Sequence, residues 1–371
     1  MKVAFVISSL GIGGAERVLV NMANYWAERG NDVTLVSMDS PDAPAFHVLN
    51  ERVRLISLNL LANSANPVQA IRQTVGRIRA IRQTMCAIRP DVIISFMDRM
   101  NVLTLFASRR LGIPTIVSDR VDPACPNIGR AWNALRTISY RYASALVLQT
   151  ARFKPFYAPK IQSRIFEVPN PISKLVRSCA PGTLQGREEI VISMGRLVDY
   201  KSFDVIINAF AEVADKNPAW KLHMYGQGPE KESLQALIDE KGLSSRIKMM
   251  GVTDEPLVKM SEASIFALAS VAEGIPNVLI EAMAMGCAVV STDVGGVPDV
   301  VVDGKDGLIV PMGDRAALSR ALGLLMSDPE LRLSIGRNAV AIRDRLSEDR
   351  IMGMWEEVVR SVTAGHKEML R

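Results

Sequence analysis

The strongest constraint on the fold is a repeated alternation of strand-length apolar runs with longer segments of helical spacing. Residues 3–8 form the first apolar run, and residues 15–29 follow with apolar residues on one helical face and Gly30 just after the end. Short continuous apolar runs are typical of strands that a parallel sheet buries on both faces. The alternation therefore predicts βαβ units and an open parallel sheet. Strands are expected at residues 3–8, 33–37, 52–58, 91–96, 114–118, 145–148 and 164–168.

The alternation stops at Pro169-Asn170-Pro171 and then restarts. A chain of 371 residues is long enough for two domains. We therefore predict two Rossmann-like α/β/α domains facing across a cleft, at residues 1–170 and 188–346, joined by a Pro- and Gly-containing linker at 171–187. Residues 347–371 are expected to form a helix that packs back on the first domain. The second domain is expected to have strands at 189–194, 221–225, 246–250, 264–268, 287–291 and 307–310, and helices at 203–216, 230–241, 255–262, 277–285, 314–326 and 329–344. The last helix is expected at 348–363.

The net charge of +5 is unevenly distributed. Residues 1–175 hold 22 Lys and Arg against 11 Asp and Glu, whereas the remainder holds 22 against 28. A basic first half suggests an anionic partner, such as a phosphorylated substrate, a nucleic acid or an anionic membrane. No apolar stretch approaches the roughly 20 residues of a membrane span, and no signal-peptide layout is present, so a cytoplasmic protein is expected. Four Cys without C-x-x-C spacing and three His disfavour a structural metal site.

A glycine-rich loop, Gly11-Ile12-Gly13-Gly14, joins the first strand to the first helix. Such a loop lets backbone N–H groups approach a phosphate at a helix N-terminus. A dinucleotide fingerprint would need a third glycine where Glu16 stands, which disfavours NAD binding. A turn without any ligand is the alternative.

Two segments of the second half carry candidate chemistry. Arg196 and Lys201 follow the strand at 189–194 and suit a diphosphate leaving group, although two solvated loop cations would give the same pattern. Glu281 is the one carboxylate between Gly274 and Thr292, a segment without Lys, Arg or His, and it lies within an apolar helix that begins with Pro and ends at Gly. A buried carboxylate must be hydrogen-bonded, either to ligand hydroxyls or to groups of the protein itself.

Residues 67–89 form a basic amphipathic segment. Apolar residues recur at helical spacing, several arginines border them, and no acidic residue occurs between Arg52 and Arg89. This pattern fits a helix that meets an anionic membrane or a lipid diphosphate. A helix packed on the core with a solvated basic face is the alternative.

Together these motifs resemble the retaining glycosyltransferases of family 4, which have the GT-B architecture. The most specific match is residues 273–284, which resemble the E-x7-E signature through Glu273 and Glu281. The resemblance covers nearly the whole chain, and it is closest to enzymes that extend polyprenyl-diphosphate-linked glycans in exopolysaccharide, O-antigen or N-glycan assembly. Supporting matches are Gly13-Gly14-Ala15-Glu16-Arg17, Gly195-Arg196-Leu197 with Lys201, and Gly226-Gln227-Gly228-Pro229.

The resemblance implies a role for each matched residue. Arg196 and Lys201 would hold the diphosphate of a nucleotide-sugar, most often UDP-linked, while Glu281 would bind ribose hydroxyls and Glu273 the transferred hexose or N-acetylhexosamine. It implies a metal-independent reaction, which agrees with the absence of D-x-D, and retention of configuration by a front-face displacement. The remaining implied donor residues are Gly14, Gly226, Val252, Ile275, Asn277 and Val278, and the implied acceptor residues are Glu16, Arg72, Arg79 and Arg82.

One position departs from the family pattern. Many relatives have a His after the strand equivalent to 114–118, where this chain has Asp119 and Arg120. These two residues are expected to take that catalytic place, and His47 is expected to lie in a surface loop. The resemblance thus implies a peripheral enzyme on the inner face of the cytoplasmic membrane, with no nucleic-acid partner. A sugar-nucleotide 2-epimerase of the same architecture and a non-catalytic sugar-binding protein are the alternatives.

Overall fold

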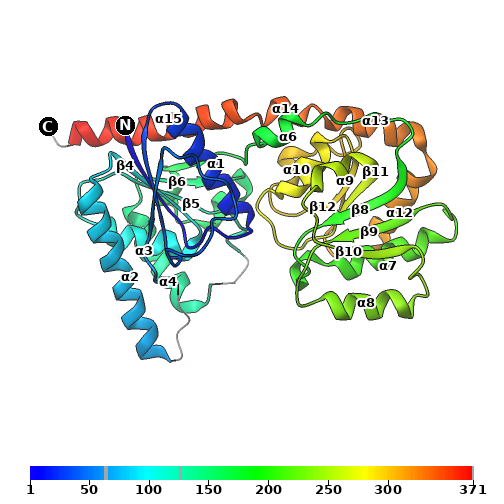
Figure 1. Cartoon of the computed structure of the whole chain (residues 1–371), viewed down its shortest axis with the longest axis horizontal. Helices are drawn as coiled ribbons and strands as arrows, with labels where there is room; N and C mark the ends of the chain where they lie inside the picture. Colours follow the sequence, from blue (N-terminus) through cyan, green and yellow to red (C-terminus); the bar gives the residue numbers. More distant parts are fainter. Residues whose placement is uncertain (62–65, 125–127, 370–371) are drawn as a thin grey trace. The chain divides into compact units, whose positions relative to one another are not determined.

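The computed structural model describes residues 1–61, 66–124 and 128–369, and the chain divides into two compact units (Figure 1). Unit 1 comprises Met1–Asn170 and Ile351–Arg371, and unit 2 comprises Pro171–Arg350. Residues 171–187, expected as a linker, belong to unit 2 and carry the short helix α6 (Lys174–Ser178).

Unit 1 is built on a parallel sheet of seven strands in the order β3-β2-β1-β4-β5-β6-β7. The order reverses between β1 and β4, which is the position where open α/β sheets bind ligands at the carboxyl ends of their strands. The strands are β1 (Lys2–Val6), β2 (Asp32–Ser37), β3 (Val53–Ser57), β4 (Val92–Phe96), β5 (Thr115–Ser118), β6 (Ala145–Leu148) and β7 (Ile165–Glu167).

Helices cover both faces of this sheet because successive strand side chains point to opposite faces. Phe5 packs on Trp26 of α1 and Phe96 stacks on Trp355 of α15, so these two helices lie on one face. Ala4, Val6 and Ile93 face the other side, where α2 and α3 contribute to the core. The helices of unit 1 are α1 (Gly14–Glu28), α2 (Pro67–Ile88), α3 (Asp98–Ser108), α4 (Arg130–Ser139), α5 (Pro159–Gln162) and α15 (Glu348–Met369), with 3-10 turns η1 (Tyr140–Tyr142) and η2 (Ala151–Phe156).

Unit 2 repeats the design with a parallel sheet of six strands in the order β10-β9-β8-β11-β12-β13. Its order reverses between β8 and β11, so the loops that follow these two strands meet at one end of the sheet. The strands are β8 (Glu188–Met194), β9 (Lys221–Tyr225), β10 (Ile247–Gly251), β11 (Ala263–Leu268), β12 (Ala288–Thr292) and β13 (Leu308–Val310).

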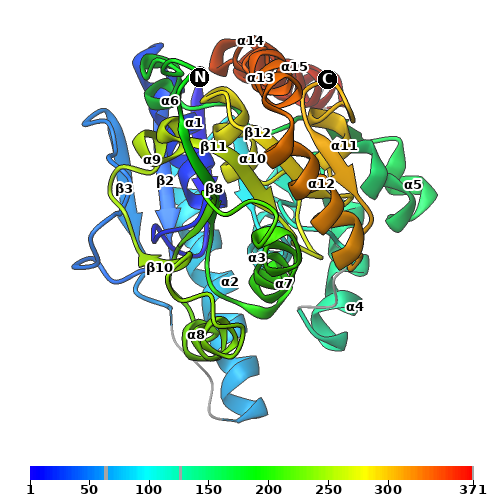
Figure 2. The ribbon, with the colours of Figure 1, turned by 90° about the vertical axis from the view of Figure 1, so that its right-hand side faces the viewer.

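Helices α7, α8 and α12 share one core with unit 2's sheet, and Figure 2 shows α7 and α12 side by side. Helices α9 and α10 contact β11 as well as each other. The elements of unit 2 besides α6 are η3 (Asp199–Lys201), α7 (Phe203–Ala214), α8 (Lys231–Glu240), α9 (Pro256–Glu262), α10 (Asn277–Ala284), α11 (Val297–Val300), α12 (Arg315–Ser327), α13 (Pro329–Ala339) and α14 (Ile342–Arg345).

The sequence-based expectation of two α/β units is confirmed, and each expected strand is present within two residues of its expected ends. One expected helix is wrong, because residues 329–344 form two helices, α13 and α14. Around Val340 and Ala341 the backbone has hydrogen bonds between residues three apart, as in a 3-10 turn. Here Ala341 N–H donates to the Asn338 carbonyl at 3.2 Å, and Arg343 N–H donates to the Val340 carbonyl at 3.0 Å. The helix expected at 348–363 continues to Met369.

Candidate active site

The loops after β8 and β9 lie against each other through glycine backbones. A Cβ on Gly226 would lie 1.8 Å from the Gly195 carbonyl oxygen, and a Cβ on Gly228 would lie 2.1 Å from that of Leu197. Leu197 N–H donates to the Gln227 carbonyl at 2.9 Å. Only glycine permits this approach, so the motif around Gly226 fixes the course of the loop that carries Arg196.

Lys201 and Glu273 form an ion pair where the loops after β8 and β11 meet. Their side chains are 14% and 12% exposed, which limits solvent screening of the pair. The backbones are tied as well, because Val271 N–H donates to the Tyr200 carbonyl at 2.9 Å. Arg196 is exposed, and its Nη2 donates to the Tyr200 hydroxyl at 3.1 Å. The structure thus brings together both predicted cations and one predicted carboxylate.

Glu281 lies on α10, which begins at Asn277 directly after Pro276. The Glu281 side chain is buried at 5% exposure, as the apolar surroundings in the sequence indicated. Ile275 is also buried, whereas Asn277 and Val278 are half-buried at the start of the helix. The predicted E-x7-E residues therefore flank one loop-to-helix junction.

A second glycine pair, Gly295 and Gly296, supports this junction and was not singled out from the sequence. Gly296 N–H donates to the Gly274 carbonyl at 2.7 Å, and Gly295 has φ +52°. A Cβ on Gly295 would lie 2.3 Å from the carbonyl oxygens of Glu273 and Gly274. Two adjacent glycines directly after β12 were the available signal.

Val252 follows β10 and is 61% exposed, and Gly226 N–H donates to the Gly251 carbonyl at 2.7 Å. The loops after β8, β9 and β10 are therefore linked by backbone hydrogen bonds. This linkage gives Val252, one of the expected donor residues, a defined position relative to the Arg196 loop.

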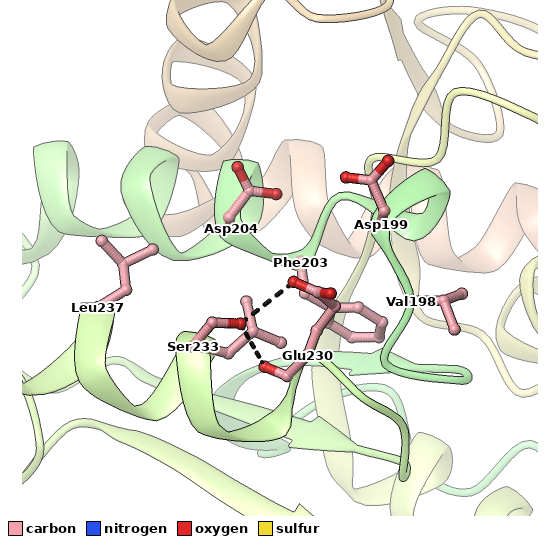
Figure 3. A pocket seen from close by; sticks show the side chains of 8 residues that line it. Val198, Asp199, Phe203, Asp204, Glu230, Ser233 and Leu237 are labelled. Atoms are coloured by element: carbon pink, nitrogen blue, oxygen red, sulfur yellow. Dashed lines mark hydrogen bonds between the residues drawn. The ribbon is translucent and has the colours of Figure 1, made fainter.

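A neighbouring hollow of about 260 Å³ lies between the N-terminal ends of α7 and α8 (Figure 3). Asp199, Asp204 and Glu230 contribute its charged groups, and the Ser233 hydroxyl donates to the Glu230 carboxylate at 3.1 Å and to its carbonyl at 2.8 Å. Three carboxylates repel a diphosphate, so this hollow is not the site that the loop cations would form.

In unit 1 the glycine-rich loop ends at Gly13, the residue before α1. A Cβ on Gly13 would lie 1.8 Å from Glu16 Oε2, so the Glu16 carboxylate folds back over the start of its own helix. Gly14, the first residue of α1, is exposed. Glu16 was expected to bind the acceptor, and the structure places its carboxylate against the loop that precedes α1.

His47 lies in a loop, as expected, and its side chain is half-buried beside the glycine-rich loop. The segment is held in place because Phe46 N–H donates to the Leu10 carbonyl at 2.9 Å. Burial and the Arg17 cation lower the pKa of His47, and a hydrogen bond to the Gly13 backbone partly offsets them. His47 Nε2 is buried without a hydrogen-bond partner among the described residues.

Asp119, which was expected to take a catalytic place, is buried among hydrogen-bond donors. It is 1% exposed and accepts hydrogen bonds from the Tyr140 hydroxyl at 2.6 Å, from Asn101 Nδ2 at 2.8 Å and from the Tyr157 hydroxyl. Burial and the Asp119 charge raise the pKa of both tyrosines. Asp119 therefore holds β5, α3 and the segments after them together.

Arg120 is buried as well, at 7% exposure. Its Nη1 donates to Asn170 Oδ1 at 2.9 Å, and its guanidinium carbon lies 4.1 Å from the Phe96 ring centroid. Burial lowers its pKa to about 9, and its Nε and Nη2 have no hydrogen-bond partner in the part of the chain that the structure describes. The guanidinium that was expected to take a catalytic place therefore packs on Phe96 and donates to Asn170.

The arginines of α2 divide into two groups. Arg72 and Arg79 are exposed, whereas Arg82 Nη1 donates to the Ala107 and Arg109 carbonyls, at 2.8 Å each. Arg82, which was expected to bind the acceptor, therefore joins α2 to the end of α3. The start of α2 extends beyond the other elements of unit 1 (Figures 1 and 2), and Val68 and Ile71 are 77% and 67% exposed there.

The part of the chain that the structure describes has neither a membrane-spanning helix nor a cluster of metal ligands. No helix among residues 1–61, 66–124 and 128–369 is long and apolar enough to cross a membrane. Among residues 1–61, 66–124 and 128–365, no three His, Cys, Asp or Glu side chains are grouped to hold a metal ion.

Comparison with protein families gives consecutive matches along the chain. Residues 12–172 match the family described as "Glycosyltransferase Family 4", and residues 180–341 match "Glycosyl transferases group 1". The chain belongs to the glycosyltransferases. The first family match covers most of unit 1 and the second covers most of unit 2.

Curated relatives of this glycosyltransferase match over its full length. A Campylobacter jejuni protein named GalNAc-alpha-(1->4)-GalNAc-alpha-(1->3)-diNAcBac-PP-undecaprenol alpha-1,4-N-acetyl-D-galactosaminyltransferase is 27% identical over 98% of both chains. A second C. jejuni enzyme, named N-acetylgalactosamine-N,N'-diacetylbacillosaminyl-diphospho-undecaprenol 4-alpha-N-acetylgalactosaminyltransferase, is 27% identical over 89% of this chain and 92% of its own.

Solved structures share the GT-B fold. Sucrose-phosphate synthase from Thermosynechococcus elongatus superposes with a TM-score of 0.85 at 18% identity, over 98% of this chain and 100% of that chain. Anabaena HepE in complex with UDP-glucose superposes with a TM-score of 0.78 at 18% identity, over the same shares. These similarities concern the fold.

Proposed function

We propose that this glycosyltransferase moves a hexose or N-acetylhexosamine from a UDP-linked donor to a polyprenyl-diphosphate-linked saccharide, with retention of configuration. The observation that carries the proposal is the group of Arg196, Lys201 and Glu273 at the strand-order reversal of unit 2, together with the buried Glu281 on α10. The names of the two Campylobacter relatives support the acceptor class, and the UDP-glucose complex of HepE supports the donor class.

The donor would lie at the carboxyl ends of β8, β9, β10 and β11. Arg196 and Lys201 would bind the diphosphate, and the first N–H groups of α10, at Asn277 and Val278, would add hydrogen-bond donors. Glu281 would accept hydrogen bonds from ribose hydroxyls, and Glu273 from the sugar. The remaining proposed donor contacts are Gly14, Gly226, Val252 and Ile275.

The chemistry would be a front-face displacement. The acceptor hydroxyl oxygen bonds to the anomeric carbon on the side from which the β-phosphate oxygen departs, and that departing oxygen takes the hydroxyl proton. Arg196 and Lys201 stabilise the charge that develops on the diphosphate, which is the role that a metal ion has in other transferases. We therefore propose a reaction that needs no metal.

The start of α2 would contact the anionic membrane that holds the acceptor. Exposed Val68 and Ile71 would enter the headgroup region, while Arg72 and Arg79 would meet phosphates. Such a helix would keep the enzyme at the inner face of the cytoplasmic membrane without a membrane span.

Binding and transfer assays test the function directly. UDP should raise the thermal midpoint of the protein, and GDP, ADP and NAD should raise it less. Incubation with UDP-sugars and a polyprenyl-diphosphate-linked N-acetylhexosaminyl acceptor should then give one glycosidic product, whose anomeric configuration NMR determines. Interconversion of the free donor without transfer would indicate an epimerase instead, and an inverted product would exclude the proposed mechanism.

Substitution of single residues tests the site. Lys201→Ala and Glu281→Ala should each lower transfer by about 100-fold, because each removes a group that contacts the donor as charge develops. Lys259→Ala is the matched control, since Lys259 pairs with Glu262 at the surface, 2.9 Å apart. Near-normal transfer by Lys201→Ala or Glu281→Ala would contradict the assignment.

A further inference from the structure

The Lys201–Glu273 pair places a carboxylate on the cation that is proposed to hold the donor's diphosphate. Both side chains are largely buried, so the carboxylate is a strong competitor for that ammonium group. The residues are 72 positions apart in the chain, and no local backbone preference brings them together. Their contact follows from β8 lying next to β11.

A diphosphate and the Glu273 carboxylate repel each other when both lie at the same ammonium group. Binding of any nucleoside diphosphate at Lys201 therefore requires the carboxylate to move away. The backbones on either side cannot move easily, since Val271 is bonded to Tyr200 and the carbonyl of Glu273 lies against Gly295. When a diphosphate replaces the carboxylate at the ammonium group, we therefore expect only the Lys201 and Glu273 side chains to move.

The two ligands of the reaction differ in what they offer the displaced carboxylate. A nucleotide-sugar supplies hydroxyl donors next to the diphosphate, whereas the free nucleoside diphosphate supplies none at that position. A partly buried carboxylate that loses its cation without gaining donors is costly. This free-energy cost weakens binding of the free nucleoside diphosphate, whereas the sugar hydroxyls of the nucleotide-sugar offset it.

We propose that the Lys201–Glu273 pair is an exchange switch that discriminates against the nucleoside diphosphate product and favours the nucleotide-sugar. The inference rests on the proposed function and concerns regulation of that same site. Its consequence is faster product release, because Glu273 forms its ion pair with Lys201 again once the sugar has been transferred. Arg196 is exposed, is not part of the pair and would contact the diphosphate of either ligand.

Calorimetric titration of UDP and of a UDP-sugar into the full-length protein tests the switch. Glu273→Gln removes the competing charge and keeps the side-chain size, so UDP should bind about 10-fold more tightly, on the scale of a close charge pair. The UDP-sugar should bind no more tightly, because Gln accepts the sugar's hydrogen bonds less well. The preference of the wild type for donor over product should therefore be lost.

Two controls separate pair exchange from general charge removal. Asp199→Asn removes an exposed carboxylate two residues before Lys201 and should tighten UDP binding by less than about 3-fold. In a Lys201→Met background, Glu273→Gln should also tighten UDP binding by less than about 3-fold. The carboxylate and the diphosphate compete for the Lys201 ammonium group, which this background lacks.

The outcomes distinguish the inference from the function. Unchanged UDP affinity in Glu273→Gln, or equal tightening in the Asp199→Asn or Lys201→Met background, overturns the switch while the proposed function stands. If neither UDP nor any UDP-sugar binds the wild type, the proposed function fails and the switch fails with it.

Discussion

At the scale of single residues, the structure separates carboxylates that face a site from carboxylates that hold the fold. Asp119 is surrounded by two tyrosine hydroxyls and an asparagine amide, and Asp98 lies nearby with Arg136 Nη1 at 3.2 Å. Burial is the larger influence on Asp98, followed by the charge of Asp119, and together they raise its pKa to about 7 despite Arg136. The folded protein therefore keeps a proton that the unfolded chain releases near its ordinary value of 3.8.

This proton gives unit 1 a defined pH dependence. Between these two pKa values the folded state binds more protons than the unfolded chain, so stability falls as pH rises from about 4 to about 7 and then levels. Asp98→Asn has no proton to lose at this position, so its unfolding free energy should not fall in this way. The difference in unfolding free energy between Asp98→Asn and wild type should therefore grow in favour of the variant by about 1–3 kcal/mol between pH 5 and pH 8. Urea denaturation at both pH values measures the difference, with Asp204→Asn as an exposed control. A constant difference would contradict the raised pKa.

At the scale of elements, loop-to-loop contacts rather than helices define the candidate site. Gly226 and Gly228 allow the loops after β8 and β9 to touch, and Gly295 allows the loop after β12 to support Glu273. These contacts leave no room for a side chain, so the loops are fixed by backbone hydrogen bonds.

Gly295→Ala should disturb the site more than an equivalent change elsewhere. Gly295 combines φ +52° with a collision at 2.3 Å, whereas Gly304 has φ +72° with nothing within 4 Å. Gly304→Ala should cost about 1 kcal/mol of unfolding free energy from backbone strain alone. Gly295→Ala should cost at least about 2 kcal/mol more and weaken UDP binding, as denaturation and calorimetry measure. Equal costs would show that the collision relaxes freely.

Helix α2 gives the second prediction at this scale. Val68→Ser with Ile71→Ser should weaken binding to phosphatidylglycerol-containing vesicles by about 10-fold, because both side chains are exposed and apolar. Arg72→Ser with Arg79→Ser should weaken use of the lipid-linked acceptor more than binding of UDP. Leu324→Ser, at a residue 46% exposed on α12, is the control in vesicle sedimentation. Unchanged sedimentation of the α2 variants would mean that this helix face does not meet the membrane.

At the scale of the whole molecule, the chain completes unit 1 only after it has built unit 2. Trp355 of α15 is fully buried in unit 1, where its ring centroid lies 5.9 Å from that of Phe96 and 5.4 Å from the Arg120 guanidinium carbon. The last helix therefore supplies core to the first sheet, and unit 1 depends on both ends of the sequence.

Trp355→Ala should lower the stability of unit 1 by about 3–5 kcal/mol, the usual cost of removing a buried aromatic side chain. Urea denaturation followed by circular dichroism should show an earlier transition for unit 1, while the transition of unit 2 keeps its midpoint. Leu324→Ala in α12 serves as the control, because that side chain is 46% exposed. An equal shift of both transitions would mean that the two units unfold together.

The sequence by itself determined the two α/β units and their strands, because apolar periodicity, Pro and Gly act over a few residues. It also located Glu281 in an apolar helix that the structure buries. It missed α3, which is buried on most sides and so lacks a one-sided apolar pattern.

Only the tertiary structure decided which charged groups meet. Lys201 pairs with Glu273, Asp119 turns toward Tyr140 and Tyr157, and His47 lies on Gly13. Each of these contacts joins segments that strand order and packing bring together, and strand order is not encoded by local backbone preference. The same alternation of strands and helices allows several strand orders, so only the folded arrangement determines which side chains face a substrate and which hold the fold.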